Sequence, residues 1–164
     1  MDSRDYRDTV GHFATGVTVV TTNVGGSLHG MTANAFCSVS LEPLLLLVCV
    51  DNLATCHGQV TAAGSFAINI LAADQEDLSN LFAQRLLPVE ARDGRLHGAP
   101  FRLDDHGEVL LDGCLAHFSC ALHAVHDGGD HGIFVGRVRE GAIHRPGEAP
   151  LLYYRGRYAT TAAG

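Results

Sequence analysis

A succession of short strand-like segments, broken by glycine-containing turns, constrains the fold of this 164-residue sequence most. Residues 17–24 are rich in β-branched side chains. The Gly25-Gly26 pair that follows supplies the positive φ angles of a tight hairpin turn before a second extended run, residues 28–41. About eight strands are expected, without the strict alternation of strand and helix that a doubly wound parallel sheet requires. Because closure removes exposed sheet edges, the pattern favours a mainly antiparallel barrel.

Six further segments have the composition of strands. They cover residues 44–50, 66–71, 109–111, 114–125, 133–140 and 151–154. Residues 44–50 form a continuous apolar run of the kind that is buried on both faces, which predicts a central strand. Residues 85–100 contain prolines, glycines and scattered charges. We interpret them as an irregular excursion within one domain that could cover a ligand.

Short helices are predicted in three places. They cover residues 3–14, 53–63 and 74–84. In the first, Tyr6, Val10 and Phe13 share one face, and Gly16 stops the pattern. In the third, Asp74 with Asp77 resembles a capping arrangement. The helices are few and short, so we expect them at the periphery of the barrel.

Composition restricts what such a domain can bind. All 11 basic residues are Arg, which excludes P-loop phosphate sites and enzymes that need a catalytic or Schiff-base Lys. A net charge of −7 without a basic run argues against nucleic acid and anionic membranes as partners. The longest apolar run is too short to cross a bilayer and the N-terminus lacks a signal pattern, so we expect a cytoplasmic protein.

Cysteine and histidine usage gives no sign of a disulfide framework or a metal site. The 5 cysteines include no CxxC pair, which indicates reduced thiols, and we expect Cys37 and Cys49 to pack as small buried residues. The closest histidines are His123, His126 and His131, and the first two project to opposite faces of a strand. Surface or turn positions are expected for six histidines: His97, His106, His117, His123, His126 and His144.

Residues 30–40 carry the most informative pattern, because small and hydroxyl-bearing side chains interrupt what should be a packed strand. Polar donors and acceptors alternate there with Ala33 and Ala35, which let the backbone approach a flat ligand closely. An ordinary edge strand is the alternative interpretation. The combination suits a heteroaromatic ring with polar edges. The chain contains neither GxSxG nor GxGxxG, so a dinucleotide would bind in a mode other than the Rossmann mode.

The order of several motifs resembles the flavin reductase family. The motifs are FATGVTVVTT at 13–22, GMTANAF at 30–36, SVS at 38–40, LSNLFA at 78–83, GDH at 129–131, VGRV at 135–138 and PLLYY at 150–154. The resemblance covers about residues 5–158. It implies that residues 1–164 form a single flavin reductase-like domain. The implied fold is a mainly β, FMN-binding split β-barrel with Greek-key, mostly antiparallel strands and two or three short peripheral helices.

The resemblance also implies an activity. Such proteins use NADH or NADPH to reduce FMN or FAD, and they supply the reduced flavin by diffusion to a flavin-dependent monooxygenase. They are usually homodimers with the flavin near the subunit interface. Two alternatives stay open on the same barrel: a non-catalytic flavin-binding or redox-sensing module, and another split-barrel flavin oxidase, such as one resembling pyridoxamine phosphate oxidase.

Carried over position by position, the resemblance assigns site residues. Those that would line the flavin ring are Thr32, Ala33, Asn34, Ala35, Ser38 and Val39. Those that would hold the ribityl chain, phosphate or adenine are Asn52, Thr55, Phe82, Ala83 and Arg85. His131 and Tyr154 would lie beside the nicotinamide, although His131 could instead stabilise its turn beside Asp130.

No acid or base is expected to carry the chemistry, because the two cofactors react with each other and the protein orients them. The nicotinamide and flavin rings must lie face to face at roughly 3–3.5 Å. Backbone amides near Ala33 and Ala35 are candidates for stabilising the reduced flavin. The phosphate loop departs from the family, since Asp51 adds negative charge and Ala54 offers only its backbone. Arg85 or an Arg of a partner subunit would then have to supply positive charge.

Overall fold

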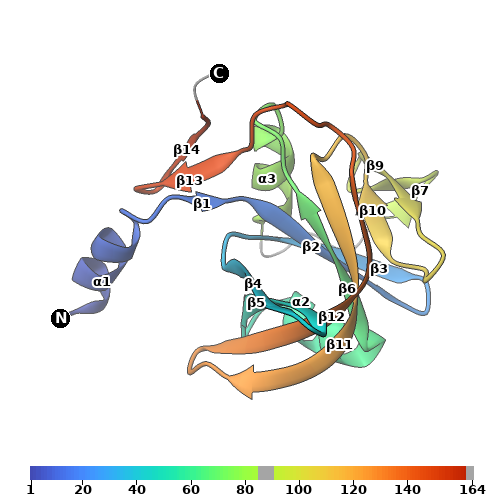
Figure 1. Ribbon diagram of the computed structural model, residues 1–164, viewed down its shortest axis with the longest axis horizontal. Coiled ribbons are helices and arrows are strands. Elements are labelled where there is room, and N and C mark those ends of the chain that lie inside the picture. Colours follow the sequence, from blue (N-terminus) through green and yellow to red (C-terminus); the bar gives the residue numbers. More distant parts are fainter. Residues whose placement is uncertain (85–90, 162–164) are drawn as a thin grey trace.

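One curved seven-stranded sheet forms the body of the molecule in the computed structural model, which describes residues 1–84 and 91–161 (Figure 1). The strand order is β3-β2-β6-β11-β12-β5-β4, and every neighbouring pair is antiparallel. The strands are β2 Thr18–Val24, β3 Ser27–Ala33, β4 Phe36–Leu41, β5 Leu44–Asp51, β6 Ser65–Ile70, β11 Ala116–Asp127 and β12 His131–Ile143. The predicted mainly β, antiparallel architecture is confirmed.

The two edges of this sheet are consecutive in the sequence. Strands β3 and β4 lie at opposite ends of the strand order, yet only Asn34 and Ala35 separate them. The sheet therefore curls so that its two edges approach each other, and the Cys49 amide donates to the Ala35 carbonyl at 3.0 Å, which extends the β4–β5 pairing by one residue towards β3. No ladder joins β3 to β4 in the described part of the chain, so the barrel is split there. The prediction of one extended run over residues 28–41 is wrong at this crossing.

The β2–β3 hairpin closes where the glycine pair predicted it. Gly25 and Gly26 have φ angles of 58° and 95°, and Val24 pairs with Ser27 across the turn. The Asn23 side chain accepts a hydrogen bond from the Gly26 amide at 2.8 Å. Left-handed backbone at both central positions matches the twist of the flanking strands, which is why glycine is needed at both.

Three helices occur in the described residues: α1 Ser3–Val10, α2 Thr55–Ala63 and α3 Glu76–Phe82. Helix α1 begins after Asp2, whose carboxylate accepts hydrogen bonds from two main-chain amides, and it has no buried residue. Helix α2 ends at Gly64, whose φ of 66° is left-handed. The predicted cap of α3 is wrong: Gln75 holds the N-cap position, and Asp74 instead forms a bidentate ion pair with Arg145.

Two smaller sheets complete the fold. One contains β1 Thr15–Gly16, β13 Leu152–Tyr154 and β14 Arg157–Ala159. The other contains β7 Ala91–Arg92, β8 Arg95–Leu96, β9 Ala99–Leu103 and β10 Val109–Leu111. The excursion predicted as irregular over residues 85–100 is therefore made of short hairpins from residue 91 onward. Its earlier part lies outside the described residues.

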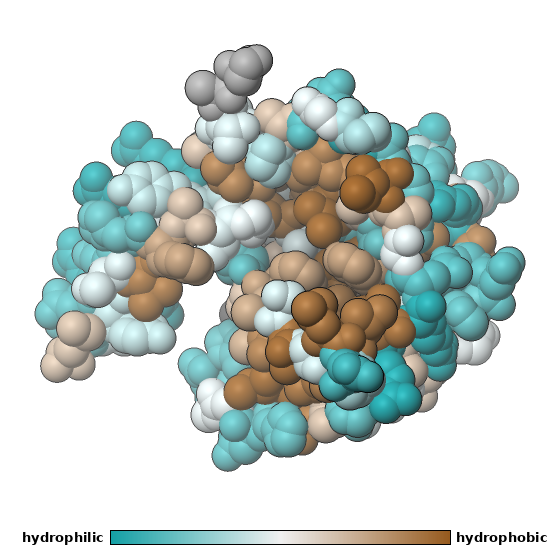
Figure 2. All heavy atoms as spheres, viewed as in Figure 1, coloured by the Kyte–Doolittle hydropathy of each residue, from teal (hydrophilic) through white to brown (hydrophobic). Residues whose placement is uncertain are grey.

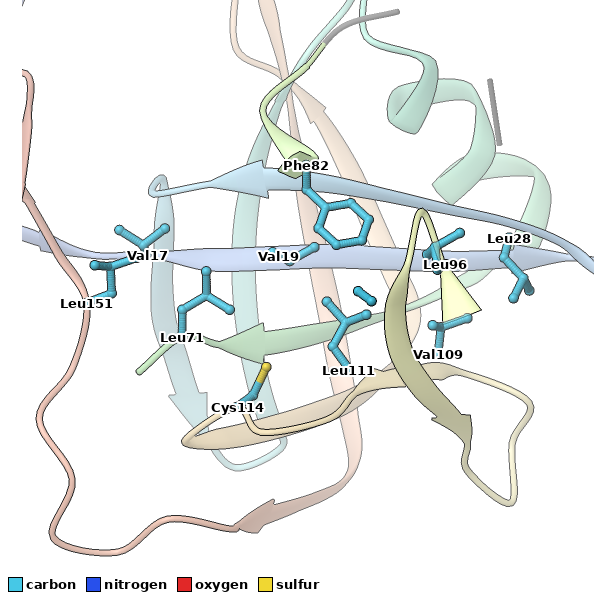
Figure 3. Close-up of a cluster of buried hydrophobic side chains, with 11 residues drawn as sticks. Val17, Val19, Leu28, Leu71, Phe82, Leu96, Val109, Leu111, Cys114 and Leu151 are labelled. Carbon is cyan, nitrogen blue, oxygen red and sulfur yellow. The ribbon is translucent and has the colours of Figure 1, made fainter. Parts of the chain in front are cut away.

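Two hydrophobic clusters lie on the two faces of the main sheet. Inside the barrel, Val20, Val48, Ile68 and Phe134 pack together, and each is fully buried. The other cluster lies between the sheet and the layer that carries α3 and β8–β10, and Figure 3 shows Phe82 pointing into it. Successive residues of β2 enter different clusters, so β2 is the kind of strand that is buried on both faces.

Strand β5 does not have the predicted environment. It lies second from one edge of the sheet, and only Leu46, Val48 and Val50 are buried. The alternate positions face outward, and Leu44 is 51% exposed. The continuous apolar run of residues 44–50 therefore belongs to a strand whose outer face is apolar and partly exposed, and not to a central strand.

The predicted environments of two cysteines and one histidine also need correction. All five thiols are free, but Cys37 is exposed and Cys49 is half-buried, because both point away from the barrel interior. His117 is buried rather than superficial, and its Nδ1 lies 2.5 Å from Nε2 of the exposed His144.

In the described part of the chain, no helix combines the length and apolarity needed to cross a membrane.

Candidate functional site

A cavity of about 300 Å³ occupies the split in the barrel, between the open edge of β3 and the end of β5. The first wall is the stretch His29, Gly30, Met31, Thr32, Ala33, Asn34 and Ala35. The opposite wall and the ends are formed by Cys49, Asp51, Leu53, Ala54, Thr55, Phe82, Ala83, Gln84 and His131. Eight of the residues predicted for flavin or nicotinamide thus line one cavity: Thr32, Ala33, Asn34, Ala35, Thr55, Phe82, Ala83 and His131.

The β3 wall offers backbone groups and small side chains. Because β3 is an edge strand, alternate residues direct their N–H and C=O groups away from β2. The Thr32 hydroxyl donates to the Ser79 carbonyl at 2.6 Å, so its oxygen is left to accept. The Asn34 amide donates to the Thr15 hydroxyl at 3.1 Å, which fixes the side chain and leaves its carbonyl oxygen free to accept. A planar ligand with polar edges fits this wall.

Phe82 closes one side of the cavity at the end of α3. Its ring packs directly on the backbone of Gly30, where an added Cβ would lie 2.6 Å from the Phe82 Cε1 atom. The ring is 3% exposed, so Phe82 shapes the cavity more than it touches solvent. Glycine at position 30 is what lets the helix end approach the strand this closely.

The start of α2 forms another side. Ala54 is the N-cap residue, and no side chain caps this nine-residue helix. Unpaired amides and the positive end of the helix dipole therefore favour an anionic group near Thr55. Asp51 lies beside this helix start, and one of its carboxylate oxygens accepts a hydrogen bond from the Leu53 amide at 2.8 Å.

His131 begins β12, directly opposite Asp51 in the strand register. Its Nδ1 donates to the Asp130 carboxylate at 2.7 Å, and this hydrogen bond is the main reason why the pKa of Asp130 is lowered. Nε2 is left for the cavity. The next residue is Gly132. Glycine is required there because an added Cβ would lie 2.7 Å from Nε2 of His57. His131 thus both stabilises its turn and lines the cavity.

Four predicted site residues lie outside the cavity lining. Ser38 and Val39 are exposed residues of β4, where a register shift between Ser38 and Ser40 interrupts pairing with β5. Asn52 donates to the Gly129 carbonyl at 2.9 Å, so it holds the turn before His131 instead of facing the cavity. Tyr154 lies beside His12, with ring centroids 6.2 Å apart. Arg85 lies outside the described residues.

Comparison with known proteins decides the family. A family model described as "Flavin reductase like domain" matches residues 10–162. The chain belongs to this family.

Curated relatives of this flavin reductase like domain share its sequence over nearly the full chain. The reductase component of a flavin-dependent trigonelline monooxygenase from Acinetobacter baylyi is 44% identical, over 97% of this chain and 49% of that relative. An NADH-dependent FAD reductase from Streptomyces globisporus is 42% identical, over 96% of this chain and 85% of that relative. The chain spans about half the length of the first two curated relatives that it matches.

Solved structures agree with the fold of this flavin reductase like domain. BorF, the flavin reductase component of a bacterial two-component tryptophan halogenase, superposes with a TM-score of 0.88 at 43% identity, over 97% of this chain and 98% of that one. The NADH:FAD oxidoreductase SgcE6 of Streptomyces globisporus superposes with a TM-score of 0.90 at 38% identity, over 100% of this chain and 97% of that one. The predicted family and split-barrel fold are confirmed.

Several cavity residues of this flavin reductase like domain were not predicted. His29 is half-buried, and its Nδ1 is buried with no hydrogen-bond partner in the described chain. Burial, and then the nearby His97, lower the pKa of His29. Cys49 and Leu53 also line the cavity, and burial raises the pKa of the Cys49 thiol. His29 directly precedes the GMTANAF motif on the same strand, which is the signal that could have found it.

Proposed function

We propose that this chain is an NAD(P)H-dependent flavin reductase that transfers hydride to N5 of FMN or FAD. The observation that carries the proposal is the cavity in the barrel split. It combines an edge strand with small residues, a helix N-terminus and the Gly-Asp-His turn. Family membership and the names of the relatives support the same conclusion.

The residues of the cavity fit a flavin. Ala33 and Ala35 leave room for a flat ring against the β3 edge, and the uncapped start of α2 suits a phosphate. The buried Nδ1 of His29 lacks a partner that a polar ligand could supply. Acceptors at Thr32 and Asn34 would face the edge of the ring.

Hydride acceptance at N5 is the chemistry that a bound flavin supplies. The chain's part is orientation. The edge amides of β3 would hold the polar edge of the ring and stabilise negative charge on it. His131, held by Asp130, would contact the carboxamide of the nicotinamide and so help to orient the co-substrate. Leu53 and Phe82 keep apolar surface around the ring and limit the access of water.

Two partners are part of the proposal. A flavin-dependent monooxygenase would consume the reduced flavin, which the names of several relatives support. A second copy of the chain would cover the outer face of β4 and β5. Figure 2 shows an apolar patch on this face, and Val39, Leu41 and Leu44 are 49%, 88% and 51% exposed there.

One turnover assay tests the activity. Purified protein is mixed with FMN or FAD in catalytic amounts and with NADH or NADPH, and absorbance at 340 nm is followed. We expect bleaching that depends on both protein and flavin. Flavin binding without nicotinamide oxidation would identify the non-catalytic module, and oxidation of another substrate without nicotinamide would identify an oxidase.

A further inference from the structure

Ser79 is a completely buried polar residue in the middle of helix α3. It lies one helical turn before Phe82 and Ala83, which close one side of the cavity in the barrel split. A buried hydroxyl or carbonyl group is expected to find hydrogen-bond partners. The partners of Ser79 lead in two directions, to the wall of the cavity and to the C-terminal hairpin.

The main-chain carbonyl of Ser79 joins two residues that line the cavity. The Thr32 hydroxyl donates to this oxygen at 2.6 Å, and the Ala83 amide donates to it at 3.0 Å. Thr32 belongs to β3, and Ala83 is the C-cap residue of α3. One oxygen thus connects the strand wall of the cavity to its helix wall, so the position of Ser79 determines where the Thr32 hydroxyl lies.

The side chain of Ser79 is held by Tyr158 of β14, and Figure 1 shows α3 next to the β13–β14 hairpin. The two hydroxyl oxygens are 2.8 Å apart, and the Tyr158 hydroxyl also donates to the Asn80 carbonyl oxygen at 3.2 Å. Because that oxygen can only accept, the Tyr158 proton is used there, and Ser79 donates to Tyr158. The hairpin therefore fixes the helical turn that carries the Ser79 carbonyl.

This network decides what the Thr32 hydroxyl can offer a ligand. A main-chain carbonyl only accepts, so the Thr32 proton is committed to Ser79 and the hydroxyl presents lone pairs. Val24 and Ser27 close the two-residue turn as a hydrogen-bonded pair, and such pairs alternate along the β2–β3 ladder. The Thr32 amide therefore points away from β2. Thr32 places one acceptor and one donor at the open edge of β3.

One edge of the flavin ring matches this arrangement. The imide N3–H lies between two ring carbonyls, so this edge presents a donor beside an acceptor in both the oxidised and the reduced ring. A hydroxyl that can only accept favours N3–H at its position. It disfavours a ring carbonyl there, because two acceptors would face each other without a proton.

We propose that Ser79 and Tyr158 are positioning residues for flavin recognition. Through the Ser79 carbonyl they hold the Thr32 hydroxyl as the acceptor for the imide N3–H of the ring. Neither is among the described residues that line the cavity, so both act through Thr32. This inference rests on the proposed reductase function and adds how the chain selects the ring edge that meets β3.

The test compares FMN with 3-methyl-FMN, in which a methyl group replaces the N3 proton. Quenching of flavin fluorescence gives the Kd of each ligand, and the measured quantity is the ratio of the Kd for 3-methyl-FMN to the Kd for FMN. The variants are Thr32→Val, Thr32→Ser, Ser79→Ala and Tyr158→Phe. Tyr153→Phe is the matched control. Its ring lies 5.5 Å from that of Tyr158, but its hydroxyl is outside the network.

We expect Thr32→Val to raise the Kd for FMN about fivefold, the size of one lost hydrogen bond, and to leave the Kd for 3-methyl-FMN unchanged. The ratio therefore falls about fivefold. Thr32→Ser restores the hydroxyl and should keep the ratio of the wild type. Ser79→Ala and Tyr158→Phe should each lower the ratio about two- to threefold, because a misplaced acceptor bonds N3–H less well. Tyr153→Phe should leave the ratio unchanged.

A residue with a merely structural role weakens the binding of both flavins equally and leaves the ratio at its wild-type value. That result for both Ser79→Ala and Tyr158→Phe would overturn the positioning role, and an unchanged ratio in Thr32→Val would overturn the contact with N3–H. Circular dichroism checks folding, and if Ser79→Ala does not fold, Tyr158→Phe decides the positioning role.

Failure of the proposed function has a different signature. A wild type that binds both flavins with the expected ratio but does not oxidise NADH or NADPH would refute the reductase activity and leave the recognition of N3–H in place. A wild type that oxidises reduced nicotinamide with a ratio that no variant alters would retain the activity and refute the inference.

Discussion

Close approach at single glycines sets the shape of the cavity in the barrel split. Gly30 allows the Phe82 ring to contact the β3 backbone, and Gly132 allows His57 to contact the start of β12. Neither glycine has a left-handed φ angle, so space rather than backbone conformation requires them. The identity of such residues could be read from the sequence, but the side chain that each one accommodates could not, because that neighbour lies far away in the chain.

Substitution of Gly30 by Ala should damage both stability and flavin binding. The added Cβ would meet the Phe82 ring, which is confined by its buried cluster, so we expect a loss of about 1–3 kcal/mol in the free energy of unfolding. Flavin affinity should fall because Phe82 is displaced. Gly58 in α2 serves as control, since its Cβ position is open, and Gly58→Ala should stabilise by roughly 0.4–1 kcal/mol. Urea denaturation and fluorescence titration with FMN measure both effects.

His131 is the side chain to test for co-substrate binding. We expect His131→Ala to raise KM for the nicotinamide with little loss of flavin affinity, because Nε2 points away from the Asp130 contact. His126→Ala, exposed on the same hairpin, is the matched control. Steady-state kinetics that match the wild type would remove His131 from the site.

The His117–His144 pair predicts how stability depends on pH. Burial is the main cause that lowers the pKa of His117 from 6.5, and His144 and then Arg102 add to it, while Asp104 acts in the opposite direction. Glu140 lies 3.9 Å from Nε2. The unfolded chain therefore binds more protons than the folded chain in the window just below pH 6.5, and stability falls as pH falls through it. Urea denaturation between pH 7.5 and 5.5 should show this slope, and His117→Gln should reduce it.

At the scale of elements, local patterns predicted where most strands and helices form, but not how they pair. The Gly25-Gly26 turn and the helix stop at Gly64 follow from local backbone chemistry. The break at Asn34 could not be predicted, because β3 and β4 are separated only by the closure of the whole sheet. Asp74 failed as a cap because a distant partner, Arg145, holds its carboxylate.

The same limit explains the candidate site. Thr32, Ala33, Asn34 and Ala35 line the cavity together because they form one continuous strand and its exit, where sequence neighbours remain spatial neighbours. Ser38 and Val39 continue that sequence, but after the crossing they belong to the other edge of the sheet and are exposed. His29 was missed because its role depends on burial against residues far along the chain.

The C-terminal hairpin holds α3 in place through one hydroxyl. Tyr158 shares a hydrogen bond of 2.8 Å with the Ser79 hydroxyl and donates to Asn80, and the Ser79 carbonyl accepts from Thr32. Tyr158→Phe should cost about 1 kcal/mol of stability, and it should weaken flavin binding because the end of α3 loosens. Thermal unfolding and FMN titration measure this. Tyr154→Phe in the same hairpin should leave stability unchanged, and an equal loss there would contradict the argument.

At the scale of the whole molecule, the β4–β5 hairpin presents apolar side chains to solvent. Val39, Leu41 and Leu44 follow one another around the β4–β5 hairpin and are 49%, 88% and 51% exposed, and Figure 2 shows an apolar patch over these strands. A monomer would leave this patch in water. The proposed burial of the patch against a second copy would account for an apolar outer face on β5, the strand next to the edge strand β4.

The double variant Leu41→Asp and Leu44→Asp tests this arrangement, because two buried charges would make the association unfavourable. We expect light scattering to give the mass of a dimer for the wild type and half of it for the variant. Ile143→Asp provides the control, since Ile143 is 75% exposed at the far end of β12 and should leave the dimer intact. If the wild type is a monomer, or if the double variant keeps the dimer mass, the apolar face of β4 and β5 is not the surface between subunits.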